Sequence, residues 1–234
     1  MAVVLEGGCR VSTMNEGSPQ VFGSIKAWNQ IGKASGADAI SLRILEFDPG
    51  TSPVLRNQEC DEVLYLLEGS CTVVIDGNAY KLGPDTGVYL RPGQTLQVEN
   101  ASVVRFVSSQ CPGATLNQSA SIVRLSDQRA MPTGDRWYRV LIDEQVTQFV
   151  GSIPPGRAPD HFHEYEEVLF ILRGEGRMWA GESNTPIGPG SCVYLPRRQV
   201  HCVENTGDGE LRLLGVFYPA GSPAVRYETA DERG

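Results

Sequence analysis

The sequence predicts an all-β fold of two tandem halves, each a β sandwich or barrel, and three features of the chain support this fold class. Short apolar runs rich in β-branched and aromatic residues recur along most of its length. Turns such as Asp48-Pro49-Gly50, Asp76-Gly77 and Arg91-Pro92-Gly93 separate these runs at intervals of about ten residues, which is typical of a β sandwich or barrel. The run Glu62–Gly69 then returns as Glu167–Gly174, so the whole pattern occurs twice.

The repeat keeps a single register across several segments, which indicates an internal duplication rather than a chance match. The further segments that match at the same offset are Gly83-Pro84 with Gly188-Pro189, Val88–Leu90 with Val193–Leu195, and Val98–Asn100 with Val203–Asn205. Residues Cys111–Ala120 have the composition of a linker. We therefore expect a first domain at residues 1–115 and a second at residues 116–234.

The expected strands of the first domain follow from its apolar runs. They are Ile40–Phe47, Glu62–Leu67, Cys71–Ile75, Gly87–Leu90, Leu96–Glu99 and Val103–Val107. The first 35 or so residues look irregular, with a short strand or arm near Val21–Gly23 that could cross to the other barrel or to another subunit.

Composition excludes some classes of function. The net charge of −8 and the pI of about 5.0 disfavour nucleic-acid binding, which needs a basic surface. No apolar run is long enough to span a membrane, and the first residues lack the basic and apolar regions of a secretory signal. The six cysteines have no C-x-x-C spacing, so we expect reduced thiols and a cytoplasmic protein.

The three histidines of the chain gather in one part of the sequence. Residues i and i+2 of an extended segment point to one side, so His161 and His163 can present two imidazoles together. Glu167 opens the following apolar run, and His201 lies in a later strand pair. Three imidazoles and one carboxylate suit a divalent transition metal, with one or two positions left for water or substrate.

These residues resemble the two sequence motifs of the cupin superfamily. The first motif corresponds to His161-x-His163-x3-Glu167-x6-Gly174, and the second to Gly190-x5-Pro196-x-Arg198-x2-His201-x3-Asn205, with Arg198 where the family usually has Gly. The resemblance implies a bicupin, that is, two fused double-stranded β-helix (jelly-roll) barrels, with the metal inside the mouth of the second.

The offset of the repeat also locates the corresponding positions in the first barrel. They are Arg56, Gln58, Glu62 and Leu96, so only the carboxylate of the ligand set is kept. Arg has no lone pair to offer a metal and Leu has no polar atom, so we expect a degenerate site without metal. We expect Arg56 to pair with Glu62 in place of the ion; alternatively, Arg56 binds an anion.

Two classes of function are consistent with this pattern. The first is a metalloenzyme that uses one divalent ion (Mn, Fe, Ni, Zn, Cu or Co) to act on a small, anionic, oxygenated metabolite, as a dioxygenase or as an isomerase, decarboxylase or lyase. The second is a non-catalytic binding or sensor protein with a structural metal. Cupins often pair through sheet edges, so a homodimer is possible.

Two further residues are candidates for roles in catalysis. Tyr165 lies between the ligands and could act as acid, base or lid, or simply cap the barrel. Arg177 could hold a substrate carboxylate, or it could lie exposed along Trp179. We expect Glu164 and Glu166 to be exposed.

Overall fold

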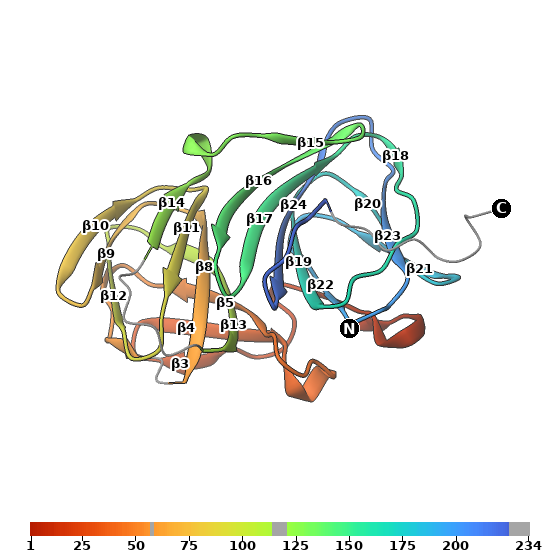
Figure 1. Ribbon diagram of the computed structural model, residues 1–234. Coiled ribbons are helices and arrows are strands. Elements are labelled where there is room, and N and C mark those ends of the chain that lie inside the picture. The colour runs from red at the N-terminus through yellow and green to blue at the C-terminus, as the bar shows by residue number, and fades with distance from the viewer. Residues whose placement is uncertain (57–58, 114–120, 225–234) are drawn as a thin grey trace.

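The structure is a computed structural model that describes residues 1–56, 59–113 and 121–224. It shows two β barrels side by side, the first at the left of Figure 1 and the second at the right. Each barrel consists of a large and a small antiparallel sheet that enclose an apolar interior. The predicted all-β fold of two tandem barrels is therefore confirmed. No helix in the described ranges is long and apolar enough to cross a membrane.

The first barrel has a seven-stranded sheet in the order β14-β11-β8-β13-β5-β4-β3 and a smaller sheet in the order β10-β9-β12-β6, with β7 also paired to β12. Its strands are β3 (Gln20–Phe22), β4 (Ile25–Ile31), β5 (Leu42–Phe47), β6 (Gly50–Thr51), β7 (Leu55–Arg56), β8 (Cys60–Glu68), β9 (Cys71–Ile75), β10 (Asn78–Leu82), β11 (Thr86–Leu90), β12 (Thr95–Asn100), β13 (Val104–Pro112) and β14 (Ser121–Arg124).

The second barrel has an eight-stranded sheet in the order β1-β2-β22-β19-β24-β17-β16-β15 and a four-stranded sheet in the order β18-β23-β20-β21. Its strands are β1 (Val3–Val4), β2 (Arg10–Thr13), β15 (Met131–Thr133), β16 (Arg136–Asp143), β17 (Thr147–Ile153), β18 (Gly156–Arg157), β19 (Glu166–Arg173), β20 (Gly176–Ala180), β21 (Ser183–Ile187), β22 (Ser191–Leu195), β23 (His201–Asn205) and β24 (Leu211–Tyr218). Three short 3-10 helices complete the described chain: η1 (Glu6–Gly8), η2 (Lys33–Ser35) and η3 (Leu125–Asp127).

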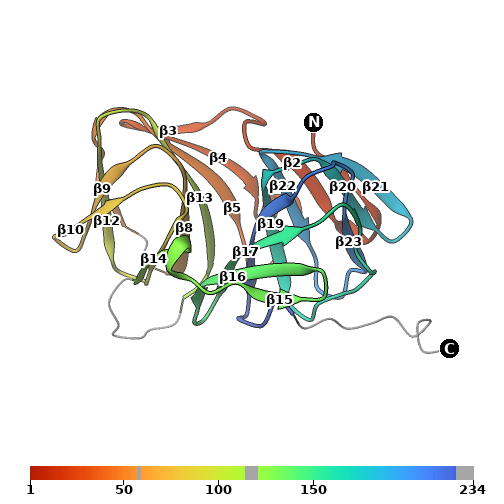
Figure 2. The same cartoon turned by 90° about the horizontal axis from the view of Figure 1, so that it is seen from above.

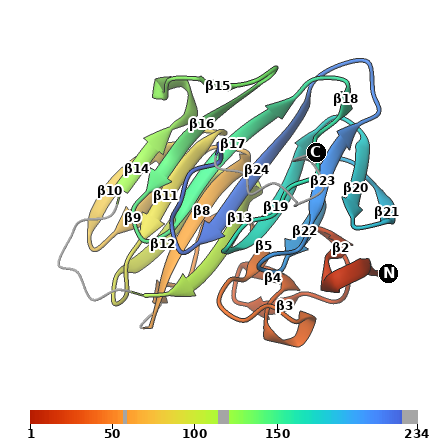
Figure 3. The ribbon, with the colours of Figure 1, turned by 45° about the vertical axis from the view of Figure 1, so that its right-hand side comes forward.

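The two halves of the chain exchange strands. Strand β2 pairs with β22, so the beginning of the chain extends the large sheet of the second barrel, as Figures 2 and 3 show. In the other direction, β14 pairs with β11 of the first barrel. The short strand predicted near Val21–Gly23 is β3, which pairs with β4 and stays in the first barrel, so the N-terminal strands that cross are β1 and β2. The predicted boundary between residues 115 and 116 lies outside the described residues.

Strand alternation separates three apolar cores. On β8, Leu64 and Leu66 face the interior of the first barrel, whereas Val63 and Tyr65 face a third cluster that contains residues of both halves. On β19, Leu169 and Ile171 likewise face the second interior, and Val168 and Phe170 join the shared cluster. The two large sheets therefore pack against each other, and this packing holds the barrels together.

Glu166 provides a polar contact within this interface. Its carboxylate accepts hydrogen bonds from the backbone N–H groups of Asp38, Ala39 and Ile40 and from the hydroxyl of Tyr194. Burial alone would raise the pKa of Glu166, but these hydrogen bonds outweigh it and lower the pKa. The expectation that Glu166 is exposed was wrong, because alternation turns it away from the Glu167 side and into the interface.

Candidate metal centre

The three histidines converge at the mouth of the second barrel. The backbones of His161 and His201 form an antiparallel bridge, with N–O distances of 3.1 and 2.8 Å. The backbone N–H of Arg198 donates to the carbonyl of His163 at 2.7 Å, which ties the loop before β19 to the loop before β23. One ring nitrogen from each histidine lies within 4.8 Å of the other two. Within the described ranges no other group of three potential ligands comes together in this way.

Backbone carbonyls orient two of the imidazoles. Nδ1 of His161 lies 3.0 Å from the carbonyl oxygen of Pro159, and Nδ1 of His201 lies 2.7 Å from that of Gln199. Because a carbonyl only accepts, both Nδ1 atoms carry the proton in the neutral rings. Each Nε2 then keeps its lone pair for a metal. Histidines that bind metals in proteins commonly donate their other ring N–H to a backbone carbonyl in this way.

Glu167 lies beside the histidine group but reaches only part of it. Its Oε2 is 3.6 Å from Nε2 of His163 and 3.9 Å from Nε2 of His201. Burial raises the pKa of Glu167 to about 8. The pKa of His201 falls well below 6.5, first through burial and then through the charge of His161. A divalent cation would compensate the buried carboxylate and bind the neutral imidazoles, so the donor set fits a metal.

A cavity of about 100 Å³ lies next to these residues. Its walls are mostly apolar, with Phe149, Leu169, Leu213 and Phe217 among the lining residues. Arg136 also lines it, and the Arg136 side chain is 12% exposed. Arg136 shares a face of β16 with the buried Tyr138, which directs both toward the interior.

Tyr165 closes one side of this cavity. Its ring stacks on His163 at 4.7 Å and on Phe217 at 4.2 Å between ring centroids. Its hydroxyl lies 3.5 Å from the carbonyl oxygen of Ser222. Tyr165 therefore lies at the predicted site, where it packs against one candidate ligand.

Arg177 does not reach the site. On β20 the buried residues are Gly176, Met178 and Ala180, so their face is the inward one. Arg177 is exposed on the opposite face and donates to Oδ1 of Asn184 at 2.6 Å. Of the two positions predicted for Arg177, the exposed one is therefore correct and the role at the cavity is not. Arg136, which sequence reasoning missed, is the guanidinium that lines the cavity. The alternation of Arg136 with Tyr138 was the available signal.

In the first barrel an arginine pairs with Glu62, the counterpart of Glu167, but it is not the predicted arginine. Nη2 of Arg43 lies 2.7 Å from Oε1 of Glu62, and Nε of Arg43 donates to the hydroxyl of Ser108 at 3.1 Å. Ser108 and Gln110 also donate to the Glu62 carboxylate, at 2.6 and 3.2 Å. The predicted pairing of Glu62 with Arg56 was wrong, because Arg56 ends β7 as an exposed residue.

Leu96 and Gln58 are the two other positions of the degenerate site in the first barrel. Leu96 is buried, as an apolar replacement for a histidine should be. Gln58 lies outside the described residues.

Strand register shows why only the first barrel has an arginine at the position of Arg43. Arg43 lies opposite Ser108, and Ser108 lies opposite Leu64. The matching positions in the second barrel are Phe149 and Gly215, which lies opposite Leu169. A Cβ on Gly215 would lie 2.2 Å from the Phe149 ring, so an apolar ring fills the space that the Arg43–Ser108 pair fills in the first barrel.

Replacement of Arg43 by alanine should destabilise the protein by about 2–4 kcal/mol, because it leaves the buried Glu62 carboxylate without its cation. Arg56→Ala should cost less than about 1 kcal/mol, since Arg56 is exposed. Urea unfolding of both variants checks this assignment, and equal costs would restore Arg56 as the partner. The double variant Arg43→Met/Glu62→Met should recover part of the loss.

Comparison with known proteins agrees with this architecture. The model of the Cupin domain family matches residues 43–109 and 149–217, one match in each barrel. An oxalate-binding protein of Thermotoga maritima is 36% identical over 68 residues, which cover 28% of this chain and 56% of that protein. The chain spans about half the length of the curated relatives that it matches first.

Two solved structures share the fold along most of the chain. A protein of Pseudomonas aeruginosa named for induction by glyoxylate has a TM-score of 0.80 at 17% identity, covering 96% of this chain and 94% of that one. Bacillus subtilis oxalate decarboxylase has a TM-score of 0.74 at 14% identity, covering 93% and 78%. The chain thus belongs to the cupin family and has the bicupin fold, with one cupin domain in each half.

Proposed function

We propose that the second barrel binds one divalent transition metal through His161, His163, His201 and Glu167, and that it acts there on a small organic carboxylate. The observation that carries the proposal is the convergence of three imidazoles, two of them held with Nε2 available by backbone carbonyls. Three neutral imidazoles and a borderline cation suit each other chemically.

The charge and size of the cavity support an anionic substrate. A divalent ion with one carboxylate ligand keeps a net charge of about +1, to which Arg136 adds a second positive group. Nε of Arg136 lies 3.7 Å from Oδ1 of Asp135, whose side chain is 72% exposed, so water screens this ion pair. A volume of about 100 Å³ admits only a molecule of a few heavy atoms. Two of the similar proteins are named for oxalate, a substrate of this size and charge.

Four residues that line the cavity have roles in this proposal. Arg136 holds a carboxylate of the substrate, since a guanidinium can bind both oxygens. Tyr165 fixes the ring of His163 by stacking, and Phe149 and Phe217 keep water from the reacting end. When bound, the metal polarises a substrate oxygen and lowers the pKa of a coordinated water. One similar structure, oxalate decarboxylase, is described with Mn(II) centres.

A binding protein without turnover is the second candidate. It is favoured by the name of the oxalate-binding relative and by the tight stack of Tyr165 on Phe217, which narrows the cavity. One measurement, conversion of the bound acid, distinguishes the two candidate functions. An enzyme converts the bound acid at a rate that depends on metal, whereas a binding protein returns it unchanged.

The test combines metal analysis with calorimetry and product analysis, using oxalate and glyoxylate as probes. Untagged protein should hold about one divalent ion per chain and bind at least one of these anions. Arg136→Gln should weaken anion binding by about 10- to 100-fold and leave the metal content unchanged, because it removes a charge-assisted contact. Arg177→Gln is the matched comparison and should leave both quantities unchanged. Loss of anion binding in Arg177→Gln, with Arg136→Gln unaffected, would contradict the proposal.

A further inference from the structure

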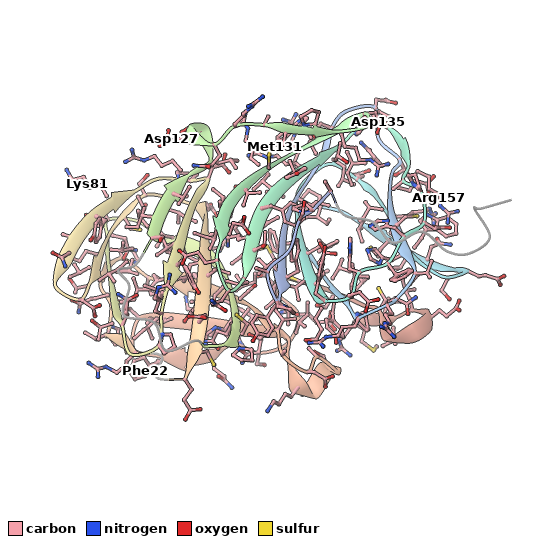
Figure 4. The ribbon with its side chains drawn as sticks, viewed as in Figure 1. Phe22, Lys81, Asp127, Met131, Asp135 and Arg157 are labelled. Atoms are coloured by element: carbon pink, nitrogen blue, oxygen red, sulfur yellow. The ribbon has the colours of Figure 1, made fainter. Side chains whose placement is uncertain are left out.

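The first barrel contains a cavity that the metal site does not explain. Its volume is about 690 Å³, against about 100 Å³ beside the histidines, and it falls in the range of about 300–1,000 Å³ of small-molecule sites. It is lined by residues of the large sheet, of the small sheet and of the edge strand β3. Figure 4 labels Phe22, which lies on this strand at the lower end of the barrel.

The inner wall of the cavity is apolar. Six of its lining side chains are aliphatic residues that form or pack against the barrel interior: Ile25, Ala27, Leu45, Leu55, Leu90 and Leu96. At its mouth, Val21 and Phe22 are 66% and 58% exposed, which is costly for large apolar side chains. A ligand with an apolar body would bury this surface, and that burial favours binding.

The polar groups of the cavity are a buried ion pair and an additional cation. Arg43 uses Nη2 for Glu62 and Nε for Ser108. Within the described part of the chain its Nη1 has no acceptor, while the Arg43 side chain stays 25% exposed. Arg56 lines the same cavity from β7. Two guanidinium groups therefore line the cavity together with one buried carboxylate.

The other acidic groups near this cavity lie at its exposed edge. Glu59 lines the rim of the cavity. The pKa of Asp76 is lowered, chiefly because its carboxylate accepts a hydrogen bond from the backbone N–H of Thr95, and the positive charge of Arg56 contributes to the same shift. Both acids are exposed, so solvent screens their charge more than it screens the buried Glu62. Arg43 already pairs with Glu62, so the charge of Arg56 is the one that a ligand with a single negative charge would neutralise. The charge of that ligand would then not be left unpaired in the cavity.

We propose that the first barrel is a second, metal-independent binding site for a small organic monocarboxylate with an apolar body, such as an aromatic acid. The carboxylate binds Nη1 of Arg43 and the guanidinium of Arg56. The body packs on Leu45, Leu90 and Leu96 and under Phe22. The arginine that pairs with Glu62 thus also binds the ligand. This site is independent of the function proposed for the second barrel.

The experiment is a titration of the full chain with benzoate and phenylacetate, each compared with its neutral amide, by ligand-observed NMR and calorimetry. The acids should bind at least about 10-fold more tightly than benzamide and phenylacetamide, since the amide cannot form the ion pair. Arg56→Gln should remove most of this preference for the acid. Arg129→Gln, an exposed arginine outside the cavity, is the matched control.

Cavity-filling variants separate the two barrels. Leu96→Trp should reduce binding of the acids by at least about 10-fold. Leu55→Trp, at a half-buried position, gives a second variant if the first unfolds, and circular dichroism shows which variants are folded. His201→Ala should leave binding of the acids unchanged. Equal affinity for acids and amides, loss of binding in His201→Ala, or no binding of any probe to folded protein would each overturn the proposal.

Discussion

Untagged His201→Ala protein is expected to lose its divalent metal, with an affinity lower by about 100-fold or more. The reason is that His201 supplies one of only three imidazoles, and loss of even an outer contact to a ligand typically costs about 10- to 100-fold. The chain has three histidines in all, so no other imidazole can bind the ion adventitiously. Elemental analysis after dialysis gives the result directly. Unchanged metal content in His201→Ala would remove the proposed centre.

Thermal unfolding provides an independent measurement of the same site. Metal at about 100 times its dissociation constant should stabilise the wild-type protein by about 2.7 kcal/mol, whereas His201→Ala should not respond. Glu167→Gln distinguishes a ligand set of three histidines alone from one that also includes Glu167. The question arises because Glu167 lies near only two of the three histidines. A loss of about 10-fold or more in affinity would identify Glu167 as a ligand. Asp127→Asn, at an exposed position of η3, is the surface control.

Glu166→Ala is expected to give the largest loss of stability, about 3–5 kcal/mol. The substitution leaves the N–H groups of Asp38, Ala39 and Ile40 and the Tyr194 hydroxyl without their acceptor inside the interface between the barrels. The measurement is the free energy of unfolding in urea. A cost below about 1 kcal/mol would show that this carboxylate does not hold the two halves together.

Two comparison variants make this result specific. Glu164→Ala changes the same residue type two positions earlier, where the side chain is 45% exposed and pairs with Arg198. It should cost less than about 1 kcal/mol, as exposed ion pairs do. Tyr194→Phe removes one of the four donors and should cost about 1 kcal/mol. The order Glu166, Tyr194, Glu164 in unfolding cost is the expected outcome.

Prediction from sequence succeeded best for the strands and the histidine group. All six expected strands of the first barrel are present, although Glu62–Leu67 lengthens to Cys60–Glu68 and Val103–Val107 moves to Val104–Pro112. His161 and His163 do not lie in a regular strand, yet they converge on His201 because the two loops are hydrogen-bonded to each other. Local spacing accounts for His161 and His163, and the hydrogen bonds between the two loops bring His201 to them.

Prediction failed where a residue depends on a strand far away in sequence. The repeat assigned Arg56 as the cation for Glu62, but β5 is one residue out of register with that repeat, so Arg43 was not recognised. For Arg177 both faces of β20 stayed open, because alternation alone does not say which face is inside. Glu166 was expected in solvent for a related reason: its partners come from the segment 38–40 of the other barrel.

Sequence by itself therefore determined the fold class, the repeat and the donor set, because these depend on short-range periodicity and on ligand chemistry. Tertiary structure decided which partners the other charged side chains have. It placed Arg136 in the cavity, Arg43 on Glu62 and Glu166 in the interface between barrels. Each of these contacts depends on the register or packing of strands that are distant in the chain, and a shift of one residue would turn the side chain to the opposite face of its sheet.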